Sequence, residues 1–267
     1  MHTHSTLSQA SMRLTFLGTG TSMGIPMLAC SCAVCNSGDP YNQRLRTSAL
    51  LECADLKLLF DAGPDLRQQA LRVGLKQLDA VLLTHTHADH ISGIDDLRPL
   101  NFAQKASIPL YGTADMLDDV RQRFAYAFSE EKSESTRPAL ELVSITHQQP
   151  FQIGALTFLP VAVQHGSWTI TGFRCGRLGY VTDASALCDA TRAALQGLDV
   201  LVLNALRTQP HPTHFSIDQA LEAIAELQPK RAFLIHMGHE VDHVTTNARL
   251  PAHVRLAYDG LAVNVEC

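Results

Sequence analysis

The 267-residue chain lacks the features of a membrane protein and of a basic nucleic-acid-binding protein. No apolar run approaches the roughly 20 residues needed to span a bilayer. The first residues, "MHTHSTLSQASM", have neither the basic start nor the apolar core of a signal peptide. The formal net charge of −5 argues against a surface built to neutralise phosphate backbones. We therefore expect a soluble, cytoplasmic protein, for which membranes and nucleic acids are disfavoured as partners.

Linkers rich in proline, glycine or serine are also missing, and no segment repeats. The sequence therefore gives no sign of a boundary between two domains. Its 46% hydrophobic content can fill a large core. We expect a polar tail over residues 1–12, a single domain over residues 13–267 and a solvated loop over the charged residues 129–137.

Short apolar runs alternate with amphipathic stretches along the chain. Residues 13–20 read as a strand that runs into a glycine turn, and residues 48–63 as two strands joined near Ala54. Residues 65–75 have the pattern of a helix, and so do residues 216–228, which begin with a capping serine. Strands and helices mixed over one length predict a layered α/β domain.

Four of the apolar runs end in a residue that can bind metal or move protons. "AVLLTH" ends at His85, "VAVQH" at His165, "GYVTD" at Asp183 and "AFLIH" at His236. Ligands and substrates collect where strands leave a sheet. One such histidine alone would usually be structural, but four together predict a functional site.

The first of these residues opens the segment "HTHADH". In an extended chain, residues two apart face the same way, so His85 and His87 can hold one metal. Asp89 and His90 then project toward a second metal. Burying so many polar groups without a ligand would leave them unsatisfied, so the segment predicts two adjacent metal sites.

Three of the seven cysteines lie in "LACSCAVC", at the spacing C-x-C-x2-C. Clustered thiols in a reducing compartment more often bind metal than form disulfides. Cys30, Cys32 and Cys35 need a fourth ligand, and His239 in "LIHMGH" fits best. This Cys3His set has the composition of a closed structural zinc site. The other cysteines are expected to be small buried hydrophobic residues: Cys53, Cys175, Cys188 and Cys267.

With these motifs the sequence resembles the metallo-β-lactamase superfamily. The matching features, in that family's order, are "FDAG" at Phe60–Gly63, "HTHADH", His165, Asp183, His236 and "YDG" at Tyr258. The resemblance implies a four-layer αββα sandwich with metals at one edge of the two sheets. It also implies hydrolysis by a water activated between two cations.

The resemblance assigns ligands residue by residue. It implies that one metal is held by His85, His87 and His165, and the other by Asp89, His90 and His236. Asp183 would bridge the two metals, and Asp61 would orient a ligand. Nitrogen and carboxylate donors suit manganese, zinc or iron.

The glycine-rich "LGTGTSMGIP", the cysteine triplet and "HMGH" resemble the accessory phosphodiesterases of the carbon-phosphorus lyase pathway. This narrower resemblance implies that the substrate is a small, cyclic ribose or nucleotide phosphodiester. It implies that His214 assists the leaving oxygen, with Asp89 and Asp183 also catalytic. Arg207 is positioned to hold a phosphate oxygen. Asn204 stands where the family carries an aspartate, and the role of His211 stays open.

Two other function classes are compatible with part of the sequence. A transfer-RNA 3′-processing nuclease shares the metal motif but needs a basic arm to grip RNA, and the acidic chain shows no such insertion. A non-catalytic, metal-dependent binding module would not need a complete, open two-metal site. The exact substrate stays open, and so does the oligomeric state, including a homodimer.

Overall fold

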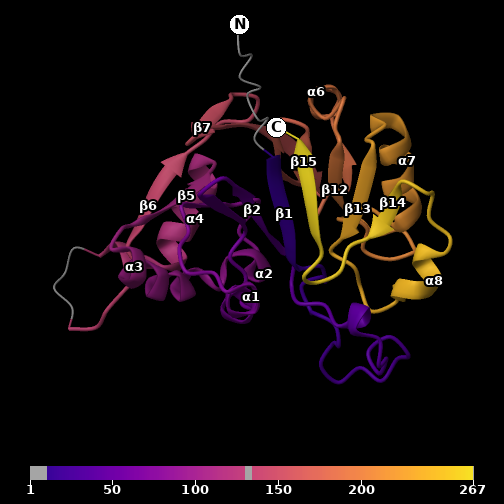
Figure 1. The fold of residues 1–267 in the computed structure, drawn as a ribbon, viewed down its shortest axis with the longest axis horizontal. Coiled ribbons are helices and arrows are strands. Elements are labelled where there is room, and N and C mark those ends of the chain that lie inside the picture. Colours follow the sequence, from indigo (N-terminus) through magenta and orange to yellow (C-terminus); the bar gives the residue numbers. More distant parts are fainter. Residues whose placement is uncertain (1–10, 130–133, 267) are drawn as a thin grey trace, which may run out of the picture.

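The computed structural model describes residues 11–129 and 134–266. Two sheets pack face to face, and helices cover both outer faces (Figure 1). The predicted four-layer αββα sandwich is confirmed. The first strand begins at Ser11, two residues before the expected domain start. Residues 1–10 of the predicted tail lie outside the described residues.

The first sheet carries the N-terminal half of the chain and the last strand. Its order is β15-β1-β2-β3-β4-β5-β6. The bounds are β1 Ser11–Gly18, β2 Ser48–Cys53, β3 Leu56–Phe60, β4 Ala80–Leu82, β5 Ile108–Gly112, β6 Leu140–Ser144 and β15 Ala262–Glu266. β3 to β6 run parallel, whereas β1 pairs antiparallel with both β15 and β2. β2 and β3 pair antiparallel, so the two strands predicted within residues 48–63 are confirmed.

The second sheet has the order β11-β8-β9-β10-β12-β13-β14, and β7 also pairs with β8. The bounds are β7 Phe151–Ile153, β8 Leu156–His165, β9 Trp168–Cys175, β10 Leu178–Val181, β11 Ala186–Leu187, β12 Val200–Asn204, β13 Arg231–Ile235 and β14 Val254–Leu256. β10, β12, β13 and β14 are parallel, so their carboxyl ends meet at one edge.

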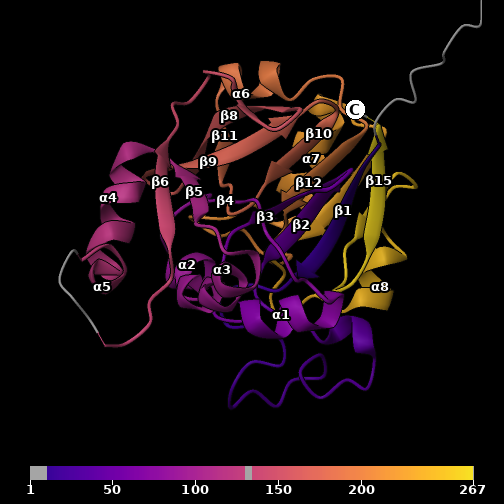
Figure 2. The same ribbon diagram turned by 60° about the vertical axis from the view of Figure 1, so that its left-hand side comes forward.

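The helices form the two outer layers (Figure 2). The N-terminal half supplies α1 Leu66–Val73, α2 Ala88–Ile91, α3 Arg98–Gln104, α4 Ala114–Arg123, α5 Ala125–Phe128 and the 3-10 turns η1 Pro40–Asn42 and η2 Ile94–Leu97. The C-terminal half supplies α6 Asp189–Ala194, α7 Ile217–Leu227 and α8 His243–Asn247. Both predicted helices are confirmed, and the Ser216 side chain caps α7 in a capping box with Gln219.

Three apolar cores separate these layers. The central core joins the inner faces of the two sheets, where the Phe60 and Tyr180 rings stack at 4.2 Å. A second core packs α7 on its sheet, and a third packs α1, α3 and α4 on the other sheet. Among the described helices, none combines the length and apolarity required to traverse a bilayer.

Cysteine burial differs in part from expectation. Cys53 and Cys175 are buried as predicted, and Cys267 lies outside the described residues. Cys188 is exposed, so its prediction was wrong. It stands at the N-cap of α6, where its Sγ contacts Thr191 Oγ1 at 3.3 Å, and a helix start on the outer layer faces solvent. In the predicted loop over 129–137, the described residues 134–136 are exposed.

Candidate metal centre

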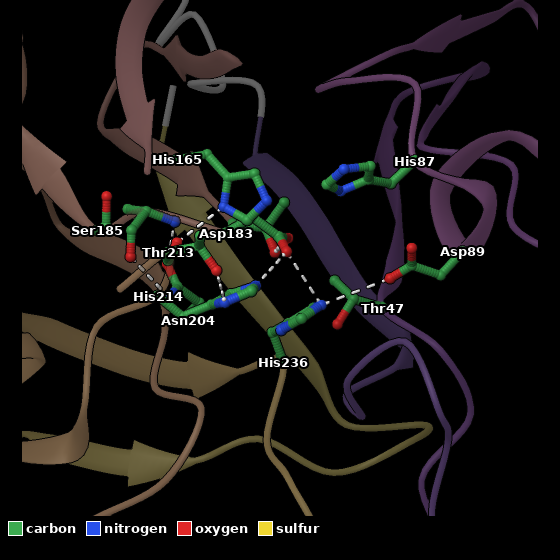
Figure 3. A network of polar contacts seen from close by, with 12 residues as sticks. Thr47, His87, Asp89, His165, Asp183, Ser185, Asn204, Thr213, His214 and His236 are labelled. Atoms are coloured by element: carbon green, nitrogen blue, oxygen red, sulfur yellow. Dashed lines mark hydrogen bonds and ion pairs between the residues drawn. The ribbon is translucent and has the colours of Figure 1, made fainter. Parts of the chain in front are cut away.

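The polar strand ends predicted from the sequence converge at one edge of the sandwich. His85 follows β4, His165 ends β8, Asp183 follows β10 and His236 follows β13; all four are buried. Figure 3 shows His87 and Asp89 on one side of the site, in the N-terminal half, facing side chains of the C-terminal half. The packing of the two sheets therefore assembles the site.

Backbone strain marks the same place. Asp61, Asp183 and His236 each follow a strand and have left-handed backbones, with φ of 61°, 56° and 55°. Non-glycine residues seldom adopt this region, and such strain persists where surrounding structure enforces it. Each sharp turn points a ligating or orienting side chain into the site as the chain leaves its sheet.

The first predicted donor set comes together as expected. His85, His87 and His165 present ring nitrogens that lie within 4.8 Å of one another. His85 Nε2 and His87 Nδ1 are 3.0 Å apart. His165 Nδ1 donates to the Thr213 carbonyl at 2.7 Å, so its Nε2 is the nitrogen available to a cation.

The second predicted set is formed by Asp89, His90 and His236, again within 4.8 Å. His90 Nε2 lies 3.2 Å from Asp89 Oδ2, and His236 Nε2 lies 3.6 Å from the same oxygen. α2 provides Asp89 and His90, since the helix begins just after His87.

Asp183 lies between the two sets. Its Oδ1 is 3.1 Å from His236 Nε2, and its Oδ2 is 3.4 Å from His90 Nε2. Its carboxylate also lies within 4.8 Å of ligand nitrogens of His85 and of His165. This is the position that a bridging carboxylate requires.

The chemistry of these donors fits divalent cations. Within the described residues, the buried Nε2 atoms of His90 and His236 have no hydrogen-bond partner. Burial lowers the pKa of His90, but Asp89, Asp183 and Asp61 outweigh it and raise the pKa well above its ordinary range. Carboxylates gathered around buried imidazole nitrogens that make no hydrogen bond favour bound cations.

A hydrogen-bond network behind the ligands fixes their orientation. Asp61 accepts from His90 Nδ1 at 2.7 Å and from the Thr84 hydroxyl and backbone N–H at 2.8 Å. Thr84 Oγ1 in turn lies 3.0 Å from His85 Nδ1. Asp61 thus contacts one ligand directly and another through Thr84, the pattern that fixes ligand tautomers. Thr84 was not predicted, and its one signal in the sequence is its place immediately before His85.

His214 reaches the site from the loop before α7. Its Nε2 donates to Asp183 Oδ1 at 2.9 Å, and its Nδ1 lies 2.8 Å from Thr213 Oγ1. Burial lowers the pKa of His214, and the hydrogen bond to Asp183 offsets only part of this effect. His211 Nδ1 lies 3.1 Å from the same Thr213 hydroxyl.

Arg207 and Asn204 form hydrogen bonds with backbone groups of the chain. The Arg207 guanidinium donates to the carbonyls of Gln209 and Pro210 at 3.2 and 3.1 Å, so it fastens its own loop. Buried Asn204 accepts from the Ala184 N–H at 2.6 Å and donates to the Ala184 carbonyl at 3.0 Å. An aspartate could only accept, so the amide suits the turn that carries Asp183.

The predicted sulfur cluster also forms. Cys30, Cys32, Cys35 and His239 present ligand atoms within 4.8 Å of one another. His239 Nδ1 lies 3.1 Å from Cys30 Sγ and 3.5 Å from Cys32 Sγ. The Cys35 backbone N–H donates to Cys32 Sγ and helps lower the pKa of that thiol to about 6. A thiolate is the form that binds metal.

Comparison with known proteins agrees with this geometry. Residues 57–237 match the family model of the beta-lactamase superfamily domain. The chain belongs to the metallo-β-lactamase superfamily, a family of hydrolases, as its motifs predicted. A crystal structure of a new diphosphatase from the PhnP family matches with a TM-score of 0.90 and 40% identity, covering 96% of this chain and 98% of that chain.

Two curated proteins are similar to this chain, one over almost its whole length and the other over half of it. An octanoyltransferase of Porphyromonas gingivalis is 37% identical over 258 residues, which are 96% of this chain and 52% of that protein. A ribonuclease Z of Bradyrhizobium is 30% identical over 138 residues, which are 50% of this chain and 45% of that protein. The octanoyltransferase match thus extends along almost all of this chain but only about half of that protein.

Proposed function

We propose that the protein is a dinuclear metal-dependent hydrolase of small phosphodiesters, with cyclic ribose or nucleotide phosphates as candidate substrates. One observation carries the proposal. Asp183 lies within 3.4 Å of His90 and His236 nitrogens, groups with His85 and His165 of the first donor set, and accepts from His214. A bridging carboxylate next to a proton donor is what phosphodiester hydrolysis requires.

Manganese, zinc or iron held by the two sets would supply Lewis acidity and an activated water. The chain's own residues orient the ligands and supply the proton. Asp61 and Thr84 keep the imidazoles in the tautomer whose free nitrogen faces the cations. His214 directs its Nε2 proton into the site and is positioned to pass it to the leaving oxygen. Only the protonated imidazolium can give up this proton, and the lowered pKa of His214 means that the acid form is populated more as the pH falls.

The 40% identity to a diphosphatase supports a second candidate substrate, a diphosphate diester. Its phosphoryl groups carry the charge of a phosphodiester, and the leaving group is a phosphate oxygen in place of an alkoxide. Such a leaving group needs less proton assistance. The two candidates therefore differ in how strongly they depend on His214.

We further propose that the Cys3His cluster binds one structural zinc. A closed tetrahedral set with thiolates is typical of such sites. The cluster links the β1–β2 loop to the loop after β13, which carries His236. The metal would thereby fix the position of an active-site ligand.

The first test removes the shared carboxylate. Asp183→Ala should reduce hydrolysis of bis-nitrophenyl phosphate, cyclic nucleotides and diphosphate diesters to background, because both cations lose a common ligand. Purified protein loaded with manganese, and separately with zinc, is assayed on these compounds, a thioester and a lactam. An alanine at exposed Asp118 serves as the matched control and should retain full activity.

Near-normal turnover by Asp183→Ala at saturating metal would overturn the two-metal proposal. Activity confined to the thioester or lactam would overturn the phosphodiester assignment. Activity toward precursor transfer RNA above that toward small diesters would favour the nuclease alternative. Metal binding without turnover of any compound would favour a binding module.

A further inference from the structure

A cavity of about 380 Å³ opens beside the first donor set. Its walls come from the start and middle of α4, the β8–β9 turn and the segment that carries the first metal-site histidines. The residues that line it include His85, Thr113, Asp115, Asp119 and Trp168. Since His85 is a candidate ligand, a molecule bound at the cations can extend into this space.

Trp168 is the large aromatic residue that lines this cavity. It is the single tryptophan of the chain, lies three residues after His165, and is 49% exposed. Its ring stacks on His87 at 5.0 Å with 27° between the planes. A large aromatic ring left half open beside a hydrolytic site offers a stacking surface for a planar group.

The wall formed by α4 is acidic. Asp115 accepts from the Thr113 hydroxyl, which lowers the pKa of Asp115. Burial raises the pKa of Asp119, but the hydrogen bond from Arg123 at 2.9 Å outweighs it, and the pKa is lowered. Both groups are therefore anionic at neutral pH. They repel phosphate but accept hydrogen bonds from sugar hydroxyls.

We propose that this cavity binds the nucleoside part of the substrate, with the base stacked on Trp168 and the ribose hydroxyls directed toward Asp115 and Asp119. The phosphate stays at the donor sets, where the cations are held. This inference rests on the proposed hydrolase function and narrows it. It selects nucleotide esters over phosphorylated sugars that carry no base.

The kinetic test compares two esters that release the same nitrophenol. Uridine 5′-(p-nitrophenyl) phosphate carries a ribonucleoside with free 2′- and 3′-hydroxyls, whereas methyl p-nitrophenyl phosphate carries no nucleoside. We expect Trp168→Ala to lower the ratio of their kcat/KM values by roughly 5- to 100-fold, the range for losing one stacked base. Trp168→Phe should restore most of the ratio, because phenylalanine keeps a stacking face.

Trp168→Ala can also disturb His87 and so the bound metals. Such an effect lowers the kcat/KM values of both esters alike and leaves their ratio unchanged. Asp115→Asn and Asp119→Asn should each lower the same ratio, by a smaller factor. Phe102→Ala removes another exposed aromatic ring, on α3 and away from the cavity, and should leave both rates unchanged. An unchanged ratio in Trp168→Ala would overturn the inference.

Because Trp168 is the only tryptophan, its fluorescence reports directly on the cavity. When Trp168 is excited at a wavelength that nucleobases do not absorb, adenosine monophosphate should quench its fluorescence saturably. Ribose 5-phosphate should quench it far less. Equal quenching by both compounds would overturn nucleoside binding. Base-dependent quenching without hydrolysis of either ester would support the cavity assignment and reject the proposed hydrolase function, so the two failures are distinguishable.

Discussion

His214 is the residue at which the proposed chemistry is tested most directly. Its Nε2 contacts Asp183, and its Nδ1 is held by Thr213, so the ring has one orientation. A general acid typically contributes 10²–10⁴-fold when the leaving group is poor. We therefore expect His214→Ala to slow hydrolysis of a cyclic ribose phosphate by roughly that range, and hydrolysis of a nitrophenyl phosphodiester much less.

The measurement is kcat/KM on both substrates, with bound metal determined in parallel. His253→Ala removes an exposed histidine elsewhere and should change neither rate. Equal losses on both substrates would assign His214 to phosphate binding or charge stabilisation. Loss of metal together with activity would make it a ligand, consistent with its grouping with His165 and Asp183.

At the scale of elements, the site depends on how "FDAG" packs against α2. The Ala62 N–H donates to the His90 carbonyl, and the Gly93 N–H donates to the Ala62 carbonyl, both at 2.8 Å. A Cβ on Gly63 would lie 2.0 Å from the Asp89 carbonyl oxygen, which cannot move without shifting two ligands. The short helix is thus aligned by close backbone contact.

Gly63→Ala should therefore destabilise the protein and impair the site together. Overpacking costs about 1–3 kcal/mol, and each kcal/mol lowers Tm by about 2–4 °C in a chain of this size. A ligand shift near 1 Å can cost about 10²-fold in rate. Calorimetry and kcat/KM check both effects. Gly38→Ala, which has open space around it, should change neither, and a fully active Gly63→Ala enzyme would contradict this reading of the motif.

At the scale of the whole molecule, the Cys3His cluster ties distant parts of the chain together. The long loop between β1 and β2 lies beyond the end of β1 in Figure 1. Backbone hydrogen bonds from Thr21 to Met237 and from Met237 to Thr19, each 3.0 Å, join it to the loop that carries His236. Zinc at the cluster would lock this junction.

We expect the purified protein to keep about one zinc after brief chelation that removes the more open metals. Cys32→Ser should lose that zinc and a few kcal/mol of stability, the scale associated with losing a structural metal. Elemental analysis and Tm provide the measurements. Cys188→Ser alters an exposed cysteine outside the cluster and should retain the zinc. Zinc retention by Cys32→Ser would reject the assignment.

The sequence by itself determined the features that depend on local spacing. Apolar runs fixed the strands, the serine cap fixed the start of α7, and two short motifs, "HTHADH" and C-x-C-x2-C, indicated the donor clusters. Backbone geometry explains why. Neighbouring residues keep set directions in a strand or turn, so residue type and spacing suffice to predict which side chains can act together.

Only the tertiary structure decided the contacts between loops distant in sequence. It turned Arg207 toward the Gln209 and Pro210 carbonyls, paired Asn204 with Ala184, exposed Cys188 and placed Trp168 at a cavity that α4 also lines. Irregular loops have no periodicity from which side-chain directions follow. Their conformations are fixed when two sheets pack and the buried polar groups of different loops must satisfy one another.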